Sequence, residues 1–131
     1  MMLNNSLVKS YENFRKQPTA AKELILDVGK VTGRKESAIR KWLDGSTIPD
    51  EHIRSLIEEE MNMSIDSLVN EYYRRLKLPS PALYFRQRIA KATHKSSITV
   101  MRYVRGLSKP DELAKDAISK EFNTPISILF P

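Results

Sequence analysis

Apolar residues recur along this chain at intervals of three and four positions. Leu7, Tyr11 and Phe14 follow this spacing, which places their side chains on one face of a helix. Ile39 and Trp42 are three positions apart in a later segment and follow the same rule. No stretch of useful length alternates between apolar and polar residues as a half-buried strand does. The pattern therefore predicts an all-α protein.

Proline and glycine residues divide this pattern into separate helices. Pro18 follows the first apolar stripe and Gly45 stands where a later one stops. Proline cannot continue a helix, and glycine accepts the positive φ of a helix end. The first four helices are predicted at about 6–17, 20–32, 35–44 and from Pro49 onward. The next four are predicted near 67–78, 82–93, 96–105 and 111–122.

The chain contains an internal repeat without gaps, in which Ser6 aligns with Ser67. The segment SLVKSYENFRKQPTAA, which begins at Ser6, aligns with SLVNEYYRRLKLPSPA, which begins at Ser67. Further along, KWLDGSTIPDE from Lys41 aligns with RYVRGLSKPDE from Arg102. The glycine and proline residues that end helices match at this one offset, which indicates that one structural unit occurs twice.

The repeat predicts two units of about 60 residues each, a size at which a single core is marginal. We expect the first unit over 1–66 and the second over 67–131. A continuous helix at about 64–78 is expected to be shared between the units and to stabilise both. The apolar tail is expected to dock in place of a further helix through Ile126, Ile128, Leu129 and Phe130.

The formal net charge of the chain is +6, and it is unevenly distributed. Residues 6–66 carry ten Lys and Arg against eleven Asp and Glu, a net of −1. Residues 67–131 carry twelve against five, a net of +7. An excess of positive charge suits a polyanionic partner. We therefore expect the second half to dominate any such interaction.

The residue types do not favour catalysis, a metal site or a cofactor. Cysteine is absent, which excludes disulfides, thiolate zinc sites and a cysteine nucleophile. The only histidines, His52 and His94, are forty-two positions apart. Acidic pairs at 50–51 and 111–112 recur at the start of helices, where the helix dipole explains them. There is no phosphate-binding glycine loop, so we expect a protein that is not an enzyme and binds no cofactor.

The chain also lacks the sequence signals of membrane insertion or secretion. No segment approaches the roughly eighteen consecutive apolar residues that a membrane span requires. No N-terminal stretch combines a basic start with an unbroken apolar run. We therefore expect a soluble, cytoplasmic protein with no membrane partner.

Two segments satisfy the requirements of a helix-turn-helix, in which the second helix is presented outward. Gly29 and Ala90 are small residues where the two helices cross, and Gly33 suits the positive φ of the turn. The second helix needs buried anchors three positions apart, and these are Ile39 with Trp42 and Val100 with Tyr103. Trp42 and Tyr103 are therefore interpreted as core residues.

VGKVTGRKESAIRKWLDGSTIPDE from Val28 and IAKATHKSSITVMRYVRGLSKPDE from Ile89 resemble the lambda-repressor-like helix-turn-helix family, the Cro/CI or XRE type. The resemblance occurs in both repeats, which together make up nearly the whole chain, and it implies two tandem units of this fold. The chain departs from the family pattern at and around the turn, where it has Thr32, Arg34, Thr93, His94 and Lys95.

The resemblance also implies which residues contact DNA. Residues of the third helix of each unit would face base edges: Lys35, Glu36, Ser37, Arg40, Lys41, Ser96, Ser97, Thr99, Met101, Arg102 and Arg105. Helix starts and flanking loops would contact phosphates through Thr19, Lys30, Thr32, Ser46, Ser80, Lys91, Thr93, Lys95 and Lys109. For Thr32 and Thr93, a second interpretation is that they cap or fill the turn.

These features favour sequence-specific binding of double-stranded DNA, as in a prokaryotic or phage-type transcriptional regulator. Arg102 and Arg105 lie in the more basic half, so the second unit is expected to dominate binding. The alternative is a protein–protein interaction module in which one or both units no longer bind DNA. A protein partner or self-association is compatible with the sequence, whereas no small-molecule ligand is implied.

Overall fold

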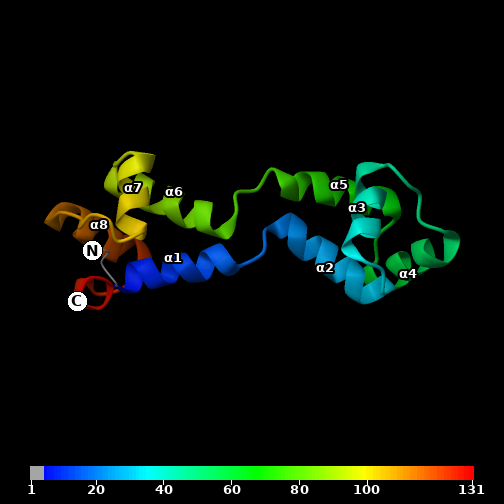
Figure 1. Ribbon diagram of the computed structural model, residues 1–131, viewed down its shortest axis with the longest axis horizontal. Coiled ribbons are helices and arrows are strands. Elements are labelled where there is room, and N and C mark those ends of the chain that lie inside the picture. The colour runs from blue at the N-terminus through cyan, green and yellow to red at the C-terminus, as the bar shows by residue number, and fades with distance from the viewer. Residues whose placement is uncertain (1–4) are drawn as a thin grey trace. The chain divides into compact units, whose positions relative to one another are not determined.

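The computed structural model describes residues 5–131 (Figure 1). This part of the chain contains nine helices and no strand, which confirms the predicted all-α class. In chain order, the helices are α1 (Ser6–Lys16), α2 (Ala20–Thr32), α3 (Glu36–Asp44), α4 (Glu51–Met61), α5 (Ile65–Leu76), α6 (Pro81–Thr93), α7 (Ser97–Val104), α8 (Glu112–Phe122) and α9 (Ile126–Leu129). Among them, none is long and apolar enough to cross a membrane.

The helix boundaries recur at the offset of the sequence repeat and are set by local signals. The bounds of α6 align with those of α2 at this offset, and the bounds of α8 align with those of α4. Thr19 caps α2 by accepting a hydrogen bond of 3.1 Å from the backbone N–H of Lys22, and Ser80 caps α6 in the same way. Asp50 and Asp111 cap α4 and α8. The predicted helices are therefore confirmed, with ends that differ by one or two residues.

The helices form two compact units that do not follow the order of the repeat. The continuous unit comprises Pro18–Pro79 and contains α2 to α5. The split unit joins the described residues up to Gln17 with Ser80–Pro131 and contains α1 and α6 to α9. These units differ from the predicted 1–66 and 67–131, because α1 packs against α6, α7 and α9, whereas α5 packs against α2, α3 and α4. The first helices of the two repeats are thus exchanged.

One helix of the continuous unit occupies the place of two separate helices in the split unit. Leu68 of α5 is matched at the repeat offset by Leu7 of α1 in one direction and by Leu129 of α9 in the other. All three leucines are buried. The expectation that a helix at 64–78 is shared between the units is therefore wrong. α5 lies entirely in the continuous unit, where it fills the places that α1 and α9 fill in the split unit. Of the apolar tail, Leu129 and Phe130 pack in the core of the split unit as expected, whereas Ile128 is exposed.

An aromatic cluster holds α1 in the split unit. The ring centroid of Phe14 lies 5.0 Å from that of Phe85, which lies 5.0 Å from that of Phe122. In the continuous unit, the positions matched to Phe85 and Phe122 hold Leu24 and Met61. Phe14 therefore has aromatic neighbours only in the split unit, and such pairs contribute about 0.5–1.5 kcal/mol beyond their buried area.

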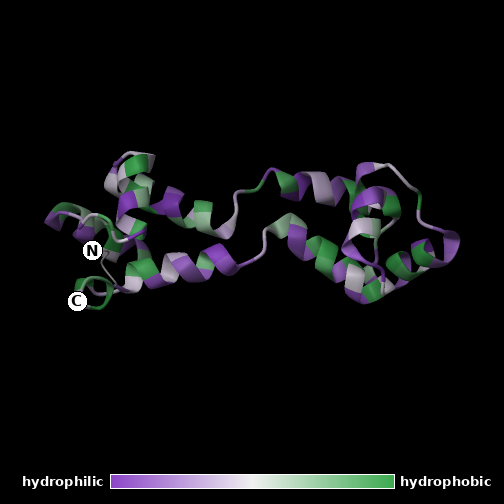
Figure 2. Ribbon diagram, in the orientation of Figure 1, coloured by the Kyte–Doolittle hydropathy of each residue, from purple (hydrophilic) through white to green (hydrophobic). Residues whose placement is uncertain are grey.

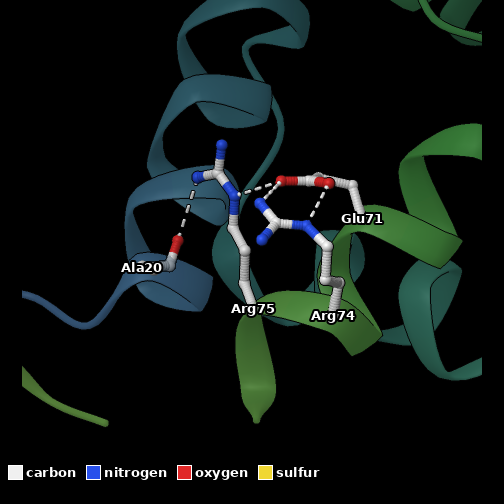
Figure 3. Close-up of polar contacts among 4 residues, drawn as sticks. All are labelled: Ala20, Glu71, Arg74 and Arg75. Carbon is white, nitrogen blue, oxygen red and sulfur yellow. Dashed lines mark hydrogen bonds and ion pairs between the residues drawn. The ribbon is translucent and has the colours of Figure 1, made fainter. Parts of the chain in front are cut away.

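A polar network around Arg75, the residue that matches Phe14, fixes α5 in the continuous unit (Figure 3). Arg75, which corresponds to Phe14, donates hydrogen bonds to Glu71 Oε1 at 2.8 Å and to the backbone carbonyl of Ala20 at 3.1 Å. Arg74 donates to both oxygens of the same carboxylate, at 2.6 Å to Oε1 and at 2.9 Å to Oε2. Arg75 thereby ties the end of α5 to the first residue of α2.

The two cores are built from matched residues. Figure 2 shows polar and apolar residues on the same helices, as the helical spacing predicts. The buried pairs at the repeat offset include Ala21 with Ala82, Leu24 with Phe85, Val28 with Ile89, Ile39 with Val100, Leu43 with Val104 and Ile57 with Ile118. Trp42 and Tyr103 pack in these cores as expected, the former half-buried and the latter buried.

Candidate nucleic-acid interface

Each unit contains two helices joined by a tight turn: α2 and α3 in the continuous unit, and α6 and α7 in the split unit. Gly33 ends α2 with φ of 69°, and its N–H donates a hydrogen bond of 2.8 Å to the carbonyl of Gly29. His94 ends α6 with φ of 59° and donates to the carbonyl of Ala90 at 2.9 Å. The left-handed conformation is therefore kept where histidine replaces glycine, a residue type that tolerates it better than most.

The close approach of the two helices explains why a small residue stands where they cross. A Cβ atom added to Gly29 would lie 3.6 Å from the carbonyl oxygen of Arg34 and 3.6 Å from Cδ1 of Ile39. These are ordinary van der Waals distances, so an alanine fits. The matched residue, Ala90, is one.

Thr32 and Thr93 close the turns through their hydroxyl groups. The Thr32 hydroxyl donates to the carbonyl of Val28 at 2.7 Å and accepts a hydrogen bond from the backbone N–H of Arg34 at 3.3 Å. Thr93 makes the matched pair of bonds at the same two distances. Of the two interpretations made from the sequence, the structure thus places both threonines in the turn, with their hydroxyls already bonded.

The outward face of α3 carries cations that an acidic residue partly neutralises. The expected base-contacting residues that lie exposed here are Lys35, Ser37, Arg40 and Lys41. Glu36 is half-buried and forms ion pairs with the ammonium of Lys22 and, at 3.6 Å, with Nε of Arg40. The start of α3 therefore presents a mixed set of charges.

The outward face of α7 is basic and contains no acidic residue. The expected base-contacting residues that lie exposed here are Ser96, Ser97, Arg102 and Arg105. Thr99 is half-buried, and its hydroxyl accepts a hydrogen bond of 3.0 Å from the hydroxyl of Ser96, the N-cap of the helix. Because the Ser96 hydroxyl is bonded to Thr99, the groups most accessible to a partner are Ser97 and the two arginines.

Met101 does not belong to this face. It is half-buried and packs against the core of the split unit, where its Sδ accepts a hydrogen bond of 3.7 Å from the hydroxyl of Tyr11. The sequence pattern placed Met101 outward because the docking of α1 on α7 was not foreseen. A direct contact of Met101 with a base is therefore not supported.

Ile98 lies on the outward face instead and was missed. Its side chain is 70% exposed, an unusual environment for an isoleucine. Ile98, Arg102 and Arg105 are spaced by four and three positions, which places them along one side of the helix. The same spacing rule, applied outward from Arg102, would have identified it.

Arg86 is a second residue that sequence reasoning missed. It is half-buried on α6, and its Nε is enclosed and has no hydrogen-bond partner among the described residues. The matched residue in the continuous unit is Ile25, which is buried in the core. The replacement of an apolar residue by a cation at a matched position is the signal in the sequence that distinguishes Arg86.

The expected phosphate-contacting residues fall into two groups. Those that lie exposed near the turns and the following loops are Lys30, Ser46, Lys91 and Lys109. Thr19 and Ser80 cap the opposite ends of α2 and α6, roughly 20 Å from the turns along helices of 13 residues. Lys95 pairs with Asp111 at 3.3 Å, and the backbone N–H of Ala114 together with this ammonium holds the pKa of Asp111 below its usual value.

Although α1 and α5 are exchanged, each unit has the same net charge as the half of the chain predicted from the repeat. The segments 6–17 and 67–79 each carry a net charge of +2. The split unit therefore has twelve basic against five acidic residues, a net of +7, and the continuous unit has ten against eleven, a net of −1. Long-range attraction of a polyanion would come from the split unit.

Acidic residues and histidines do not gather into a metal site anywhere in residues 5–131. Comparisons with known proteins add no family assignment to this geometry. No protein-family model, functionally characterised protein or solved structure matches the chain. Its function must therefore be inferred from the surfaces around α3 and α7.

Proposed function

We propose that this chain binds double-stranded DNA in a sequence-specific manner, as a prokaryotic or phage-type transcriptional regulator with two lambda-repressor-like helix-turn-helix units. The observation that carries the proposal is the outward face of α7. It presents Arg102 and Arg105 after a tight turn, on a unit with a net charge of +7. A helix offered in this way fits the major groove.

The exposed groups on α7 match the chemistry of base edges. An arginine guanidinium donates two parallel hydrogen bonds to O6 and N7 of guanine. The hydroxyl of Ser97 both donates and accepts and so suits any edge. Neighbouring lysines such as Lys91 and Lys109 are exposed and would neutralise phosphates, which gives affinity without sequence preference.

A second function, protein binding by the continuous unit, has one observation in its favour. This unit has a net charge of −1, and α4 ends with the exposed acidic run Glu58, Glu59 and Glu60. Such a surface repels DNA. Binding of DNA by the split unit alone, together with a protein partner on the continuous unit, is the outcome expected from this alternative.

The proposal is tested by measuring the affinity of purified protein for duplexes selected from a random pool at near-physiological salt. Replacing Arg102 and Arg105 together by alanine is expected to weaken binding to the preferred duplex at least tenfold, because each bidentate contact is worth about 1–3 kcal/mol of discrimination. Fluorescence anisotropy at several salt concentrations separates this loss from the general loss of phosphate attraction.

Lys9→Ala with Lys120→Ala is the matched control, since both lysines are exposed cations of the split unit outside α7. The control removes the same charge and is expected to lower affinity for preferred and random duplexes alike by a small factor. Equal effects of the two double variants on the preferred duplex would contradict the role given to α7.

A further inference from the structure

The two units share their interior but not their outward faces. At the repeat offset, the buried anchors of α3 and α7 are equivalent apolar residues, Ile39 with Val100 and Leu43 with Val104. The outward residues differ at every pair, namely Glu36 with Ser97, Ser37 with Ile98, Lys41 with Arg102 and Asp44 with Arg105. Folding therefore requires similar apolar residues in both cores, whereas the exposed residues differ and form two different surfaces.

The surface of α7 combines apolar and cationic groups. Ile98 is 70% exposed and lies one turn from Arg102, with Arg105 a further turn along the same side. An aliphatic side chain in the major groove contacts the methyl group of thymine, and arginine recognises guanine. This surface suits a half-site that contains guanine and thymine.

The surface of α3 has acidic groups at the matched places. Glu36 holds Lys22 and Arg40 in ion pairs, whereas the residues matched to these two are Leu83 and Met101. Asp44 occupies the position that matches Arg105, the residue directly after α7. Hydrogen bonds from Ser46 lower the pKa of Asp44. It is therefore ionised at neutral pH.

A carboxylate at this position changes which base is accepted. It accepts a hydrogen bond from the N4 amino group of cytosine and repels the acceptor atoms O6 and N7 of guanine. The cations that Glu36 neutralises are at the same time less available to phosphates. The continuous unit is thus suited to a cytosine where the split unit takes guanine.

We propose that the DNA site of this chain consists of two unlike half-sites, one rich in guanine and thymine that is read by α7 and one containing cytosine that is read by α3. This inference rests on the proposed function and specifies its partner. A palindromic site mirrors two identical protein surfaces related by symmetry. A single chain with two different surfaces provides no such symmetry, and the site it reads has a direction.

The test is selection of the full chain against a random duplex pool, followed by sequencing and by repetition with three variants. Asp44→Arg installs the residue that stands at the matched position directly after α7, Arg105, and Ile98→Ser installs the residue that α3 has at the matched position, Ser37. Both positions lie outside the buried cores, and circular dichroism melting verifies that each variant is folded. Lys120→Ala serves as the control.

The expected result is two unlike sequence motifs within each selected duplex. Asp44→Arg should shift the preference from cytosine towards guanine roughly tenfold in the cytosine-containing motif only, and Ile98→Ser should relax the thymine preference by about the same factor in the other motif. The control should leave both motifs unchanged.

Two like motifs, in direct or inverted order, would overturn the inference, and so would a single motif. Both of these results would leave sequence-specific DNA binding in place. The absence of any enriched sequence would instead count against the proposed function itself. The two failures are therefore distinguishable in one experiment.

Discussion

Glu71 illustrates how single residues position the helices of this protein. Its carboxylate accepts hydrogen bonds from Arg74 and Arg75, and Arg75 also reaches the carbonyl of Ala20 (Figure 3). The bonds from Arg74 and then from Arg75 lower the pKa of Glu71 from 4.5 to about 2. The carboxylate is therefore charged in the folded protein at pH values where it would be half protonated in the unfolded chain.

This pKa shift predicts a pH dependence of stability. Because the folded pKa lies below the unfolded one, the contribution of Glu71 is complete above about pH 4.5 and is lost as the pH falls towards 2. Urea unfolding of the wild type and of Glu71→Gln, measured between pH 2 and 6, should show a difference that is largest near pH 6 and shrinks on acidification. A difference independent of pH would contradict the role of this charge.

At the scale of elements, α1 and α5 are nearly equivalent helices that dock on different partners. Leu7 and Tyr11 of α1 match Leu68 and Tyr72 of α5, and all four are buried. These residues alone do not assign either helix to a unit. The difference lies one turn further on, where α1 has an aromatic ring and α5 has a guanidinium with a polar network.

Phe14→Ala is expected to destabilise the split unit and to leave the continuous unit intact. The loss of the ring contact with Phe85 should lower the free energy of unfolding of the split unit by about 2 kcal/mol, since the ring is only half-buried. Trp42, the only tryptophan, reports on the continuous unit by fluorescence, while amide signals of α6 to α8 report on the split unit.

Asn13→Ala, at the exposed neighbouring position, is the control and should change neither transition by more than a few tenths of a kcal/mol. A shift of the tryptophan transition by Phe14→Ala would show that α1 stabilises the continuous unit. That result is the one expected from the boundaries at 1–66 and 67–131.

At the scale of the whole molecule, the exchange makes one unit an insertion within the other. The chain enters the split unit through α1, builds the continuous unit over Pro18–Pro79, and then returns to complete the split unit. Two connections therefore join the units, and a proline lies at each of them, Pro18 and Pro79. Only the continuous unit can be excised as a single segment.

This topology predicts how fragments behave. The fragment 18–79 should fold alone, whereas 80–131 should remain unfolded until a peptide of residues 1–17 is added, because α1 supplies the buried Leu7 and Tyr11. Circular dichroism and amide spectra measure both effects. A peptide with Leu7→Ala and Tyr11→Ala should not induce folding. Independent folding of 80–131, or binding of the peptide to 18–79, would refute the exchange.

The sequence by itself determined the repeat, the helices and most of the candidate surface. Caps such as Thr19 and Asp50, the left-handed Gly33 and the helical spacing of apolar residues act within a few positions of the chain. Their effect is therefore readable without a fold. For the same reason Arg102 and Arg105 were found, because outward positions follow from the helix period.

Only the tertiary structure decided which unit each first helix joins. The matched leucines and tyrosines fit either core, and the choice depends on contacts with residues far along the chain, such as Phe14 with Phe85 and Arg75 with Ala20. The same long-range packing turned Met101 inward against α1. Contacts between distant segments carry no local periodicity, so the sequence pattern could not reveal them.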